Sequence, residues 1–288
     1  MTPVKNILVT GADGQLGQSF RLLSSHYSSL NLLFCNGGEL DITNSKLIET
    51  FLTENKIDFL VNCAAYTSVD KAEEEREKAL LINAEAVRML AQICKKHEVK
   101  LIHFSTDYVF SGNGSFPYLP TDITNPVNFY GVTKLEGEQY LLNENPTALV
   151  IRTSWVYSQF GKNFVKTMQH LLTHKTEINV VADQFGSPTY AVDLAAAVIQ
   201  IINGNKSLSG IYHYCNEGVI SWYDFAVAIK NGINSNCIIN PITTTQFPTA
   251  AKRPGYSALN TNSFKQDFNQ KINKWQESLD SCIDVLNG

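Results

Sequence analysis

The chain has 288 residues with 44% hydrophobic content, and its 23 basic and 27 acidic side chains leave a net charge of −4. This length allows one large domain, or a main domain that has a smaller one attached. The sequence contains no block of lysine and arginine and no apolar run as long as a membrane span, which argues against nucleic-acid and membrane partners.

In the first half of the chain, short apolar runs alternate with amphipathic segments. The predicted strands cover residues 6–9, 30–34, 58–62, 100–104 and 148–151, and the predicted helices include 45–55 and 79–97. Continuous apolar strands separated by helices are typical of a parallel sheet covered on both faces. Right-handed crossovers then give an α/β fold with a Rossmann-type doubly wound sheet, to which we assign residues 1–152.

After Trp155 this regularity ends: the loops become longer, and Pro188, Pro241, Pro248 and Pro254 stand in polar surroundings. Helices are still predicted at 163–173, 192–202 and 222–230, and strands near 179–181 and 211–214. We interpret residues 153–288 as a smaller C-terminal α/β cap that binds the substrate and is partly interleaved with the first domain.

Six cysteines are scattered through the chain without a C-x-x-C pair. Buried free thiols in a reducing compartment explain this pattern better than metal ligation does. The six histidines form no cluster with metal-ligand spacing. The N-terminus runs directly into a strand-like segment without signal-peptide architecture, so we expect a cytoplasmic protein.

A glycine-rich turn, Thr10-Gly11-Ala12-Asp13-Gly14-Gln15-Leu16-Gly17, follows the first predicted strand. Gly11 permits a tight turn, Gly14 lets backbone N–H groups approach a pyrophosphate, and Gly17 lets the next helix pack closely on the sheet. The G-x-x-G-x-x-G spacing is one residue longer than the general dinucleotide fingerprint. Its place directly after an apolar strand indicates an NAD(P)-binding domain.

The residues after the second strand leave the choice of cofactor open. In NAD-dependent enzymes an acidic residue there usually binds the ribose hydroxyls. This segment reads Phe34-Cys35-Asn36-Gly37-Gly38, without an acid or an arginine, although Glu39 or Asp41 could reach back. We expect use of NADPH or NADH, with NADPH favoured; a strong preference for NADH in kcat/KM would contradict this.

Tyr130 and Lys134 stand four residues apart at the start of a predicted helix, so they share one helix face. A lysine cation beside the phenol would lower the pKa of Tyr130 from about 10, which would make it a competent proton donor. Lys134 could also bind the nicotinamide ribose. Thr106 lies 24 residues earlier, at the end of the fourth strand. Doubly wound sheets bind ligands there, so its hydroxyl could stabilise charge on a substrate carbonyl oxygen.

Several further residues have two interpretations each. Trp155 could stack on a sugar ring or lie in the core. Arg253 could bind a phosphate or be an exposed loop arginine. The small residues at 62–66 could admit a cofactor at the sheet edge or serve helix–sheet packing. No lysine stands four residues after Tyr108, and we expect it, like His103, to be a packing residue.

Eight stretches that span nearly the whole chain can be compared with known families. They are TGADGQLG (10–17), NCAAYTSVDKAE (62–73), STDYVFSG (105–112), YGVTKLEG (130–137), RTSWVY (152–157), NFVKTM (163–168), DQFGSPT (183–189) and RPGYSALN (253–260). Together they resemble the dTDP-4-dehydrorhamnose reductases, which are extended short-chain dehydrogenases/reductases. STDYVF and RTSWVY are far more specific than the glycine triplet.

This resemblance implies reduction of the C4 ketone of dTDP-4-dehydro-L-rhamnose to dTDP-L-rhamnose, a step of polysaccharide biosynthesis. It implies that Tyr130 protonates the ketone oxygen, that Lys134 lowers the pKa of Tyr130, and that Thr106 polarises the carbonyl. Besides the glycine turn, Tyr130 and Lys134, the implied cofactor-lining residues are Asp41, Ile42, Ala65, Tyr66 and Thr67. The implied substrate contacts are Thr106, Asp107 and Trp155, to which we add Arg253.

Some members of this family dimerise through a magnesium site built from glutamates. The corresponding positions here read Gln18-Ser19, Tyr190-Ala191-Val192 and, at the C-terminus, Leu286-Asn287-Gly288. We therefore predict no such metal and a monomer or weak homodimer, which metal analysis and light scattering would test.

Two other functions remain open at this point. One is a non-catalytic dinucleotide-binding subunit, because the fold also resembles that of the regulatory β subunit of methionine adenosyltransferase. Against it, all three catalytic positions are filled. The other is a different sugar-nucleotide reductase, epimerase or dehydratase; dehydratases would have a glutamate after the position of Asp107, where this chain has Tyr108.

Overall fold

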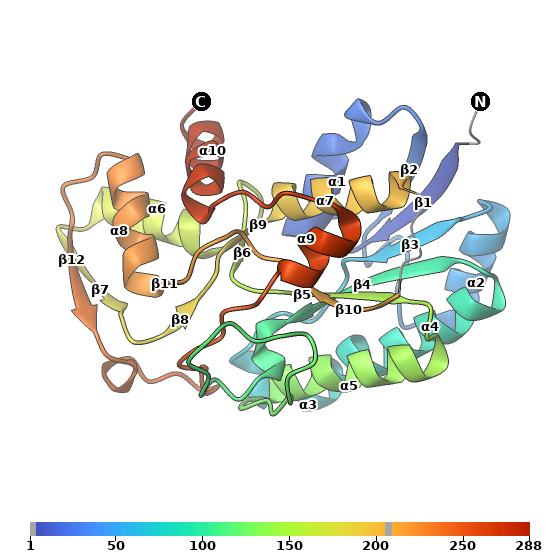
Figure 1. Cartoon of the computed structure of the whole chain (residues 1–288), viewed down its shortest axis with the longest axis horizontal. Helices are drawn as coiled ribbons and strands as arrows, with labels where there is room; N and C mark the ends of the chain where they lie inside the picture. The colour runs from blue at the N-terminus through green and yellow to red at the C-terminus, as the bar shows by residue number, and fades with distance from the viewer. Residues whose placement is uncertain (1–3, 205–208) are drawn as a thin grey trace.

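The structure, a computed structural model, describes residues 4–204 and 209–288 and contains a six-stranded parallel sheet (Figure 1). The strand order is β10-β5-β4-β3-β1-β2, and the strands are β1 (Lys5–Thr10), β2 (Leu30–Cys35), β3 (Phe59–Asn62), β4 (Lys100–Thr106), β5 (Leu149–Thr153) and β10 (Gly210–His213). All neighbouring strands in this sheet pair in parallel. The Rossmann-type fold class and the five strands predicted in the first half are confirmed.

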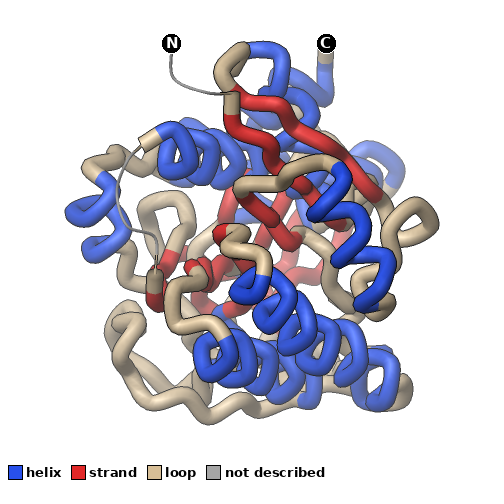
Figure 2. Tube along the Cα trace, turned by 90° about the vertical axis from the view of Figure 1, so that its right-hand side faces the viewer, coloured by secondary structure: helices blue, strands red, loops and turns tan. Residues whose placement is uncertain are grey.

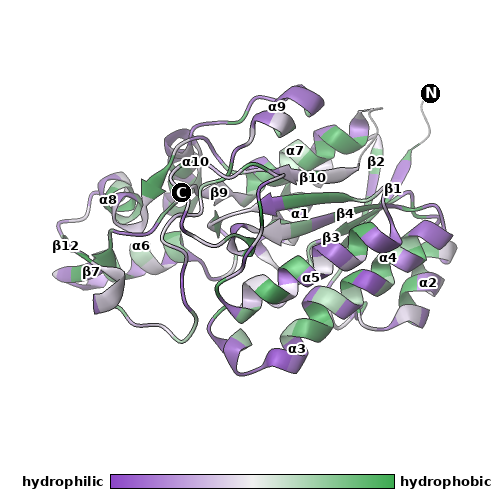
Figure 3. Ribbon diagram, turned by 60° about the horizontal axis from the view of Figure 1, so that its bottom comes forward, coloured by the Kyte–Doolittle hydropathy of each residue, from purple (hydrophilic) through white to green (hydrophobic). Residues whose placement is uncertain are grey.

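Helices cover both faces of the sheet, as Figures 1 and 2 show. Adjacent strand residues point to opposite faces, so Ile7 of β1 joins one hydrophobic cluster and Leu8 joins the other. The middle parts of the strands are accordingly largely apolar, with polar residues toward the strand ends (Figure 3). One face packs against α1 (Gln15–Leu23) and α7 (Ala191–Asn203), and the other against α2 (Ser45–Glu54), α4 (Ala86–Lys96) and α5 (Phe129–Glu144).

The sheet reverses its winding direction next to β1. From β1 the chain passes through α1 to β2 on one side, and after α2 it crosses to β3 on the other side. The carboxyl ends of β1 and β3 therefore flank a topological switch point, which is where doubly wound sheets bind ligands. In register, Thr10 at the end of β1 lies beside Asn62 at the end of β3.

Two elements from the second half of the chain belong to this sheet layer. The sixth strand, β10, pairs with β5, and α7 packs beside α1. Both had been predicted as secondary structure, but the sequence did not place them on the sheet. The division into domains at residue 152 stays a prediction.

The remaining segments form a smaller α/β region with its own hydrophobic cluster, on the left in Figure 1. It contains α6 (Phe164–His174), α8 (Trp222–Gly232), α10 (Trp275–Asn287) and the strand pairs β7 (Glu177–Val181) with β12 (Ile238–Ile242), β6 (Val156–Tyr157) with β9 (Thr189–Tyr190) and β8 (Phe185–Gly186) with β11 (Ile220–Ser221). A further helix, α9 (Asn262–Phe268), packs against the sheet cluster through Phe264. Pro241 lies in β12, where a two-stranded pair leaves an edge at which proline is tolerated.

The helix predicted at 79–97 is longer and irregular. It begins with α3 (Arg76–Leu80), continues through a π-helical turn at Leu81–Glu85, and ends with α4. Asn83, inside this turn, bonds through its side chain to the backbone N–H and carbonyl of Tyr66 and to the Thr133 hydroxyl. Single π-helical turns often occur near functional sites. In the ranges 4–204 and 209–288, no helix has the length and apolar character needed to cross a membrane.

Candidate active site

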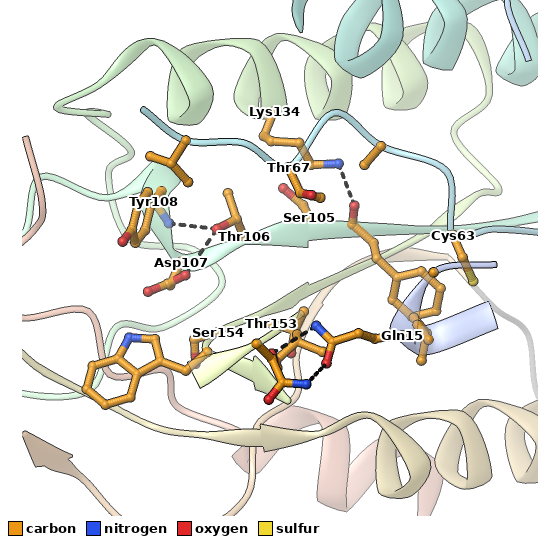
Figure 4. Close-up of a pocket in the computed structure, with 18 of the residues that line it drawn as sticks. Gln15, Cys63, Thr67, Ser105, Thr106, Asp107, Tyr108, Lys134, Thr153 and Ser154 are labelled. Atoms are coloured by element: carbon orange, nitrogen blue, oxygen red, sulfur yellow. Dashed lines mark hydrogen bonds between the residues drawn. The ribbon is translucent and has the colours of Figure 1, made fainter. Parts of the chain in front are cut away.

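A cavity of about 570 Å³ opens at the carboxyl ends of β3, β4 and β5 (Figure 4). Its walls also include the first turn of α1, the start of α5, and residues from the smaller region such as Asn163 and Trp222. The residues that the sequence singled out and that line it are Gly14, Gln15, Leu16, Ala65, Thr67, Thr106, Asp107, Tyr130, Lys134 and Trp155. The cavity therefore joins the predicted cofactor turn to the predicted reaction centre.

The glycine turn has the geometry that a pyrophosphate needs. Gly11 has φ +64°, and a Cβ there would lie 2.6 Å from the backbone nitrogen of Ala64. A Cβ on Gly17 would lie 2.5 Å from the Gly11 carbonyl oxygen. Gly14 is the N-cap of α1, and no side chain caps the helix there. The first N–H groups of α1 are thus available to an anion at the positive end of the helix dipole.

A second cavity of about 330 Å³ continues from the first along the sheet edge. Both are lined by Asp13, Gly14, Cys63 and Ala65, and the second adds Gly11, Asn36, Asp41 and Ile42. Glu39 is not in its lining, and its carboxylate accepts a hydrogen bond from the Asn36 N–H at 2.9 Å. Of the two acids considered for the ribose, the structure brings only Asp41 to this cavity. An elongated dinucleotide fits the joined shape.

Tyr130 lies in the first turn of α5. Asn128 caps this helix by accepting the Gly131 N–H at 2.8 Å, which fixes the turn that carries the phenol. The Tyr130 ring packs edge-on against Tyr108, with ring centroids 5.9 Å apart. Tyr108 therefore packs as expected, but it also lines the cavity.

Burial raises the pKa of Tyr130 above its usual value, and the Asp107 carboxylate adds to this, while a hydrogen bond with Thr106 opposes it. Lys134 Nζ donates to the Phe104 carbonyl at 2.7 Å and lies 3.2 Å from His103 Nε2. Burial lowers the pKa of Lys134 to about 8. Burial, Asp107 and Thr106 account for the pKa shift of Tyr130, and Lys134 is not among its causes. The lowering of the phenol pKa by Lys134 therefore stays a prediction.

Thr106 and Asp107 form a hydrogen-bonded pair at the end of β4. The Thr106 hydroxyl donates to Asp107 Oδ1 at 3.0 Å and accepts the Tyr108 N–H at 3.2 Å. Burial raises the pKa of Asp107 to about 7, although the nearby Ser257 and Thr106 hydroxyls oppose this shift. The buried hydroxyl of neighbouring Ser105, which also lines the cavity, has no hydrogen-bond partner in the described ranges. Such an orphaned group fits a site that a polar ligand completes.

Trp155 stacks on a second tryptophan that the sequence did not single out. The rings of Trp155 and Trp222 lie 3.5 Å apart at an angle of 10°, and both line the cavity. Trp155 has φ +46°, a left-handed backbone that few large residues adopt. Neither indole is fully buried. Trp222 is the first residue of α8, and no local pattern reveals that it reaches Trp155.

Gln15 connects the cofactor turn to the smaller region. Its Oε1 accepts from Ser158 at 3.0 Å and from Asn163 at 2.9 Å, and its Nε2 donates to the Val156 carbonyl. Asn163 in turn caps α6. These contacts join residues more than 140 positions apart, so sequence spacing could not indicate them.

Three of the predicted site residues lie outside both cavity linings: Gly17, Tyr66 and Arg253. Gly17 acts through close packing, and the backbone of Tyr66 is held by Asn83. Arg253 is neither an exposed loop residue nor free, because its guanidinium contacts Asp70 at 2.6 Å and the Ala251 carbonyl at 2.9 Å. Its contact with substrate stays a prediction.

Comparison with known proteins gives matches over almost the entire chain. A family model described as the RmlD substrate binding domain matches residues 5–287. A dTDP-4-dehydrorhamnose reductase from Aggregatibacter actinomycetemcomitans is 41% identical over 283 residues, which cover 95% of this chain and 96% of that protein. Two solved dTDP-4-dehydrorhamnose reductases superpose with a TM-score of 0.93. The one from Clostridium acetobutylicum is 39% identical and covers 98% of this chain and 100% of its own; the one from Bacillus anthracis, in complex with NADP, is 36% identical and covers 98% and 99%.

Proposed function

Since this chain belongs to the RmlD substrate binding domain family, together with dTDP-4-dehydrorhamnose reductases, we propose that it reduces the C4 ketone of dTDP-4-dehydro-L-rhamnose to dTDP-L-rhamnose. It is an NAD(P)H-dependent sugar-nucleotide reductase by this relationship. The observation that supports the specific reaction is that the cavity of about 570 Å³ joins the glycine turn to Thr106, Tyr130 and Lys134.

The chain's own residues would donate the proton and stabilise the negative charge that develops on the ketone oxygen. Bound NADPH or NADH would supply the hydride to C4. Tyr130, whose raised pKa keeps the phenol protonated at neutral pH, would give its proton to the ketone oxygen. Lys134, as a cation, would lower the phenol pKa and hold the nicotinamide ribose.

Thr106 would polarise the ketone by donating its hydroxyl hydrogen to the carbonyl oxygen. In the structure this hydrogen points to Asp107 Oδ1. Because the pKa of Asp107 is about 7, its carboxyl group is partly protonated at neutral pH and can donate to Thr106 instead. Thr106 is then free to donate to the substrate. Asp107 would in this way support the carbonyl contact besides binding substrate.

The cofactor would lie along both cavities. Gly11, Gly14, Gln15 and Leu16 would hold its pyrophosphate, and Asp41 with Ile42 its adenosine end. Residues Ala65, Tyr66 and Thr67 would line the sheet edge. No arginine lies in the described lining of the second cavity, so use of both NADPH and NADH is proposed.

The decisive experiment supplies dTDP-4-dehydro-L-rhamnose to the purified chain and follows the absorbance of NADPH and NADH. Oxidation that requires the sugar nucleotide, with dTDP-L-rhamnose as the product, is the expected result. Tight cofactor binding without turnover of dTDP- or UDP-linked keto-sugars would favour the non-catalytic subunit. Conversion of a sugar nucleotide without net cofactor oxidation would instead favour an epimerase or dehydratase.

Replacing Gly11 by alanine is expected to lower the free energy of unfolding by about 2–4 kcal/mol. The new Cβ would force the turn away from Ala64, so NADPH binding should also weaken by roughly tenfold or more. Urea unfolding and fluorescence titration with NADPH measure the two effects. The matched control is Gly37→Ala in the second cavity, which Gly11 also lines; a Cβ at Gly37 meets no described atom within 4 Å. Equal behaviour of the two variants would contradict the role of the tight turn.

Replacing Trp222 by alanine is expected to raise KM for the sugar nucleotide by roughly tenfold with little change in kcat. The reason is that Trp222 supports Trp155 at the cavity wall but lies in the smaller region, away from the residues proposed to transfer the proton. Steady-state kinetics at varied substrate concentration measures this. Trp222→Phe keeps an aromatic partner and should lose less; a fall in kcat at unchanged KM would argue against a substrate-binding surface.

We place the protein in the cytoplasm as a monomer or weak homodimer, with the dTDP-sugar as its small-molecule partner. Arg253 would contact the diphosphate after leaving Asp70, which lies 2.6 Å from it. Light scattering across a concentration series, with and without magnesium, tests the oligomeric state.

A further inference from the structure

A chain of buried side-chain hydrogen bonds lies beneath Lys134. The Thr10 hydroxyl donates to Asn62 Oδ1 at 2.7 Å, Asn62 Nδ2 lies 3.1 Å from His103 Nδ1, and His103 Nε2 lies 3.2 Å from Lys134 Nζ. These residues come from β1, β3, β4 and α5, and each is at most 2% exposed. His103, expected to be a packing residue, is therefore the direct partner of Lys134.

The orientation of the Asn62 amide is fixed by two donors. Its Oδ1 accepts both the Thr10 hydroxyl and the backbone N–H of Ala64, at 2.7 and 3.2 Å. Turning the amide over would place its NH₂ group against the Ala64 N–H, which cannot accept a hydrogen bond. Asn62 Nδ2 must therefore be the group that faces the ring, and His103 Nδ1 must accept from it.

This orientation determines the position of the proton on His103. Burial, with Lys134 nearby, lowers the pKa of the imidazole well below its usual value, so the ring is neutral. A neutral imidazole whose Nδ1 accepts has its one proton on Nε2. The Nε2–H group then points at Lys134 Nζ. An ammonium has no acceptor, whereas an uncharged amine has one lone pair, so only the amine makes a favourable contact.

We propose that His103 is a positioning residue for the reductase reaction: held by Asn62 in the Nε2–H tautomer, it donates to Lys134 and favours its uncharged amine until a cofactor binds. The amine keeps its own donor contact to the Phe104 carbonyl at 2.7 Å. Ribose hydroxyls can accept from an ammonium, so cofactor binding would favour the charged form. Cofactor binding would then raise the share of charged Lys134 that assists Tyr130, a consequence that rests on the proposed function.

The other groups around Lys134 do not reverse this preference. On α5, Tyr130 lies one turn before it and Glu138 one turn after it. Glu138 is the charged group that favours the ammonium, and its carboxylate is engaged by Arg152 of β5 at 2.7 Å. On β4, the contacts are His103 and the Phe104 carbonyl, and Asp107 follows the strand.

The first test is nitrogen NMR of the histidine rings in the full chain without cofactor, which needs no catalytic activity. The chain has six histidines, and His103→Gln assigns the relevant signals. We expect His103 to show an unprotonated Nδ1 and a protonated Nε2 at neutral pH, and Thr10→Ser, which keeps the donor to Asn62, to leave this pattern unchanged. A protonated Nδ1 or a cationic ring in the unsubstituted protein would overturn the proposal.

The second test measures Kd for NADPH against pH by fluorescence, again without turnover. Affinity should fall as pH rises through the pKa of Lys134, because the ammonium is lost. In Asn62→Asp the carboxylate accepts from Nδ1–H, so Nε2 becomes an acceptor for the ammonium. The inflection should then move upward by about one pH unit or more. An unchanged inflection in a folded Asn62→Asp variant refutes the proposal. If the NMR pattern and the shifted inflection are both observed but the protein does not reduce the sugar nucleotide, only the proposed function is refuted.

Discussion

Tyr130→Phe is expected to lower kcat for sugar-nucleotide reduction by about 10²–10⁴-fold, the usual contribution of a general acid. The substitution removes only the hydroxyl, and the ring keeps its edge-on packing against Tyr108 at 5.9 Å. Folding and NADPH affinity should therefore change little, so the loss appears in the chemical step. Single-turnover oxidation of bound NADPH separates this step from binding.

Tyr108→Phe is the matched control for this result. Tyr108 lines the same cavity, and burial raises its pKa as it does that of Tyr130, but it lies in the 3-10 turn after β4 rather than on α5. Its loss should reduce kcat far less. If Tyr130→Phe retained nearly full activity, another acid would have to supply the proton, and Asp107, with its pKa of about 7, would be the next residue to test.

Glu138→Ala is expected to lower the free energy of unfolding by about 3–5 kcal/mol, because it leaves a buried guanidinium without its partner. Arg152 Nη2 and Nε donate to the Glu138 carboxylate at 2.7 and 2.9 Å, and the side chains are 3% and 1% exposed. The other contacts of Arg152, to the Pro120 carbonyl, the Phe110 ring and His213 Nε2, do not neutralise its charge. Urea unfolding followed by circular dichroism measures the loss.

Removing both charges is the appropriate control. The double variant Glu138→Leu with Arg152→Met should be clearly more stable than Glu138→Ala, since apolar replacement of a whole buried pair is often neutral. If the single and double variants lost equal stability, the cost would come from packing and not from an unpaired charge. A double-mutant cycle assigns the coupling energy.

This ion pair matters for the site because of the elements that it joins. Glu138 lies one turn beyond Lys134 on α5, and Arg152 lies on β5, directly before the cavity residues Thr153 and Ser154. The pair therefore fixes the helix with both proposed catalytic groups against the strand that forms the opposite wall. A loss of stability at Glu138 should be accompanied by a loss of kcat, since Tyr130 and Lys134 need a fixed helix.

The sequence by itself determined the features that local patterns encode. Continuous apolar runs predicted the strands β1 to β5, because both faces of a parallel sheet are buried. The glycines after β1 were assigned correctly to a tight turn, since Gly11 has a positive φ that other residues rarely adopt. The spacing of Tyr130 and Lys134 predicted that both line one cavity, because residues four apart share a helix face.

Only the tertiary structure decided which distant side chains meet. Trp222 lies against Trp155, Gln15 against Asn163, and His103 against Lys134, although each pair is separated by 31 residues or more. The same holds for β10, a short strand from the second half that completes the sheet. Neither propensity nor spacing specifies such contacts, because they depend on how whole elements pack. The proposed role of His103 at Lys134 depends on one of them. The sequence thus determines the residue types of the site, whereas the tertiary structure determines which of them touch.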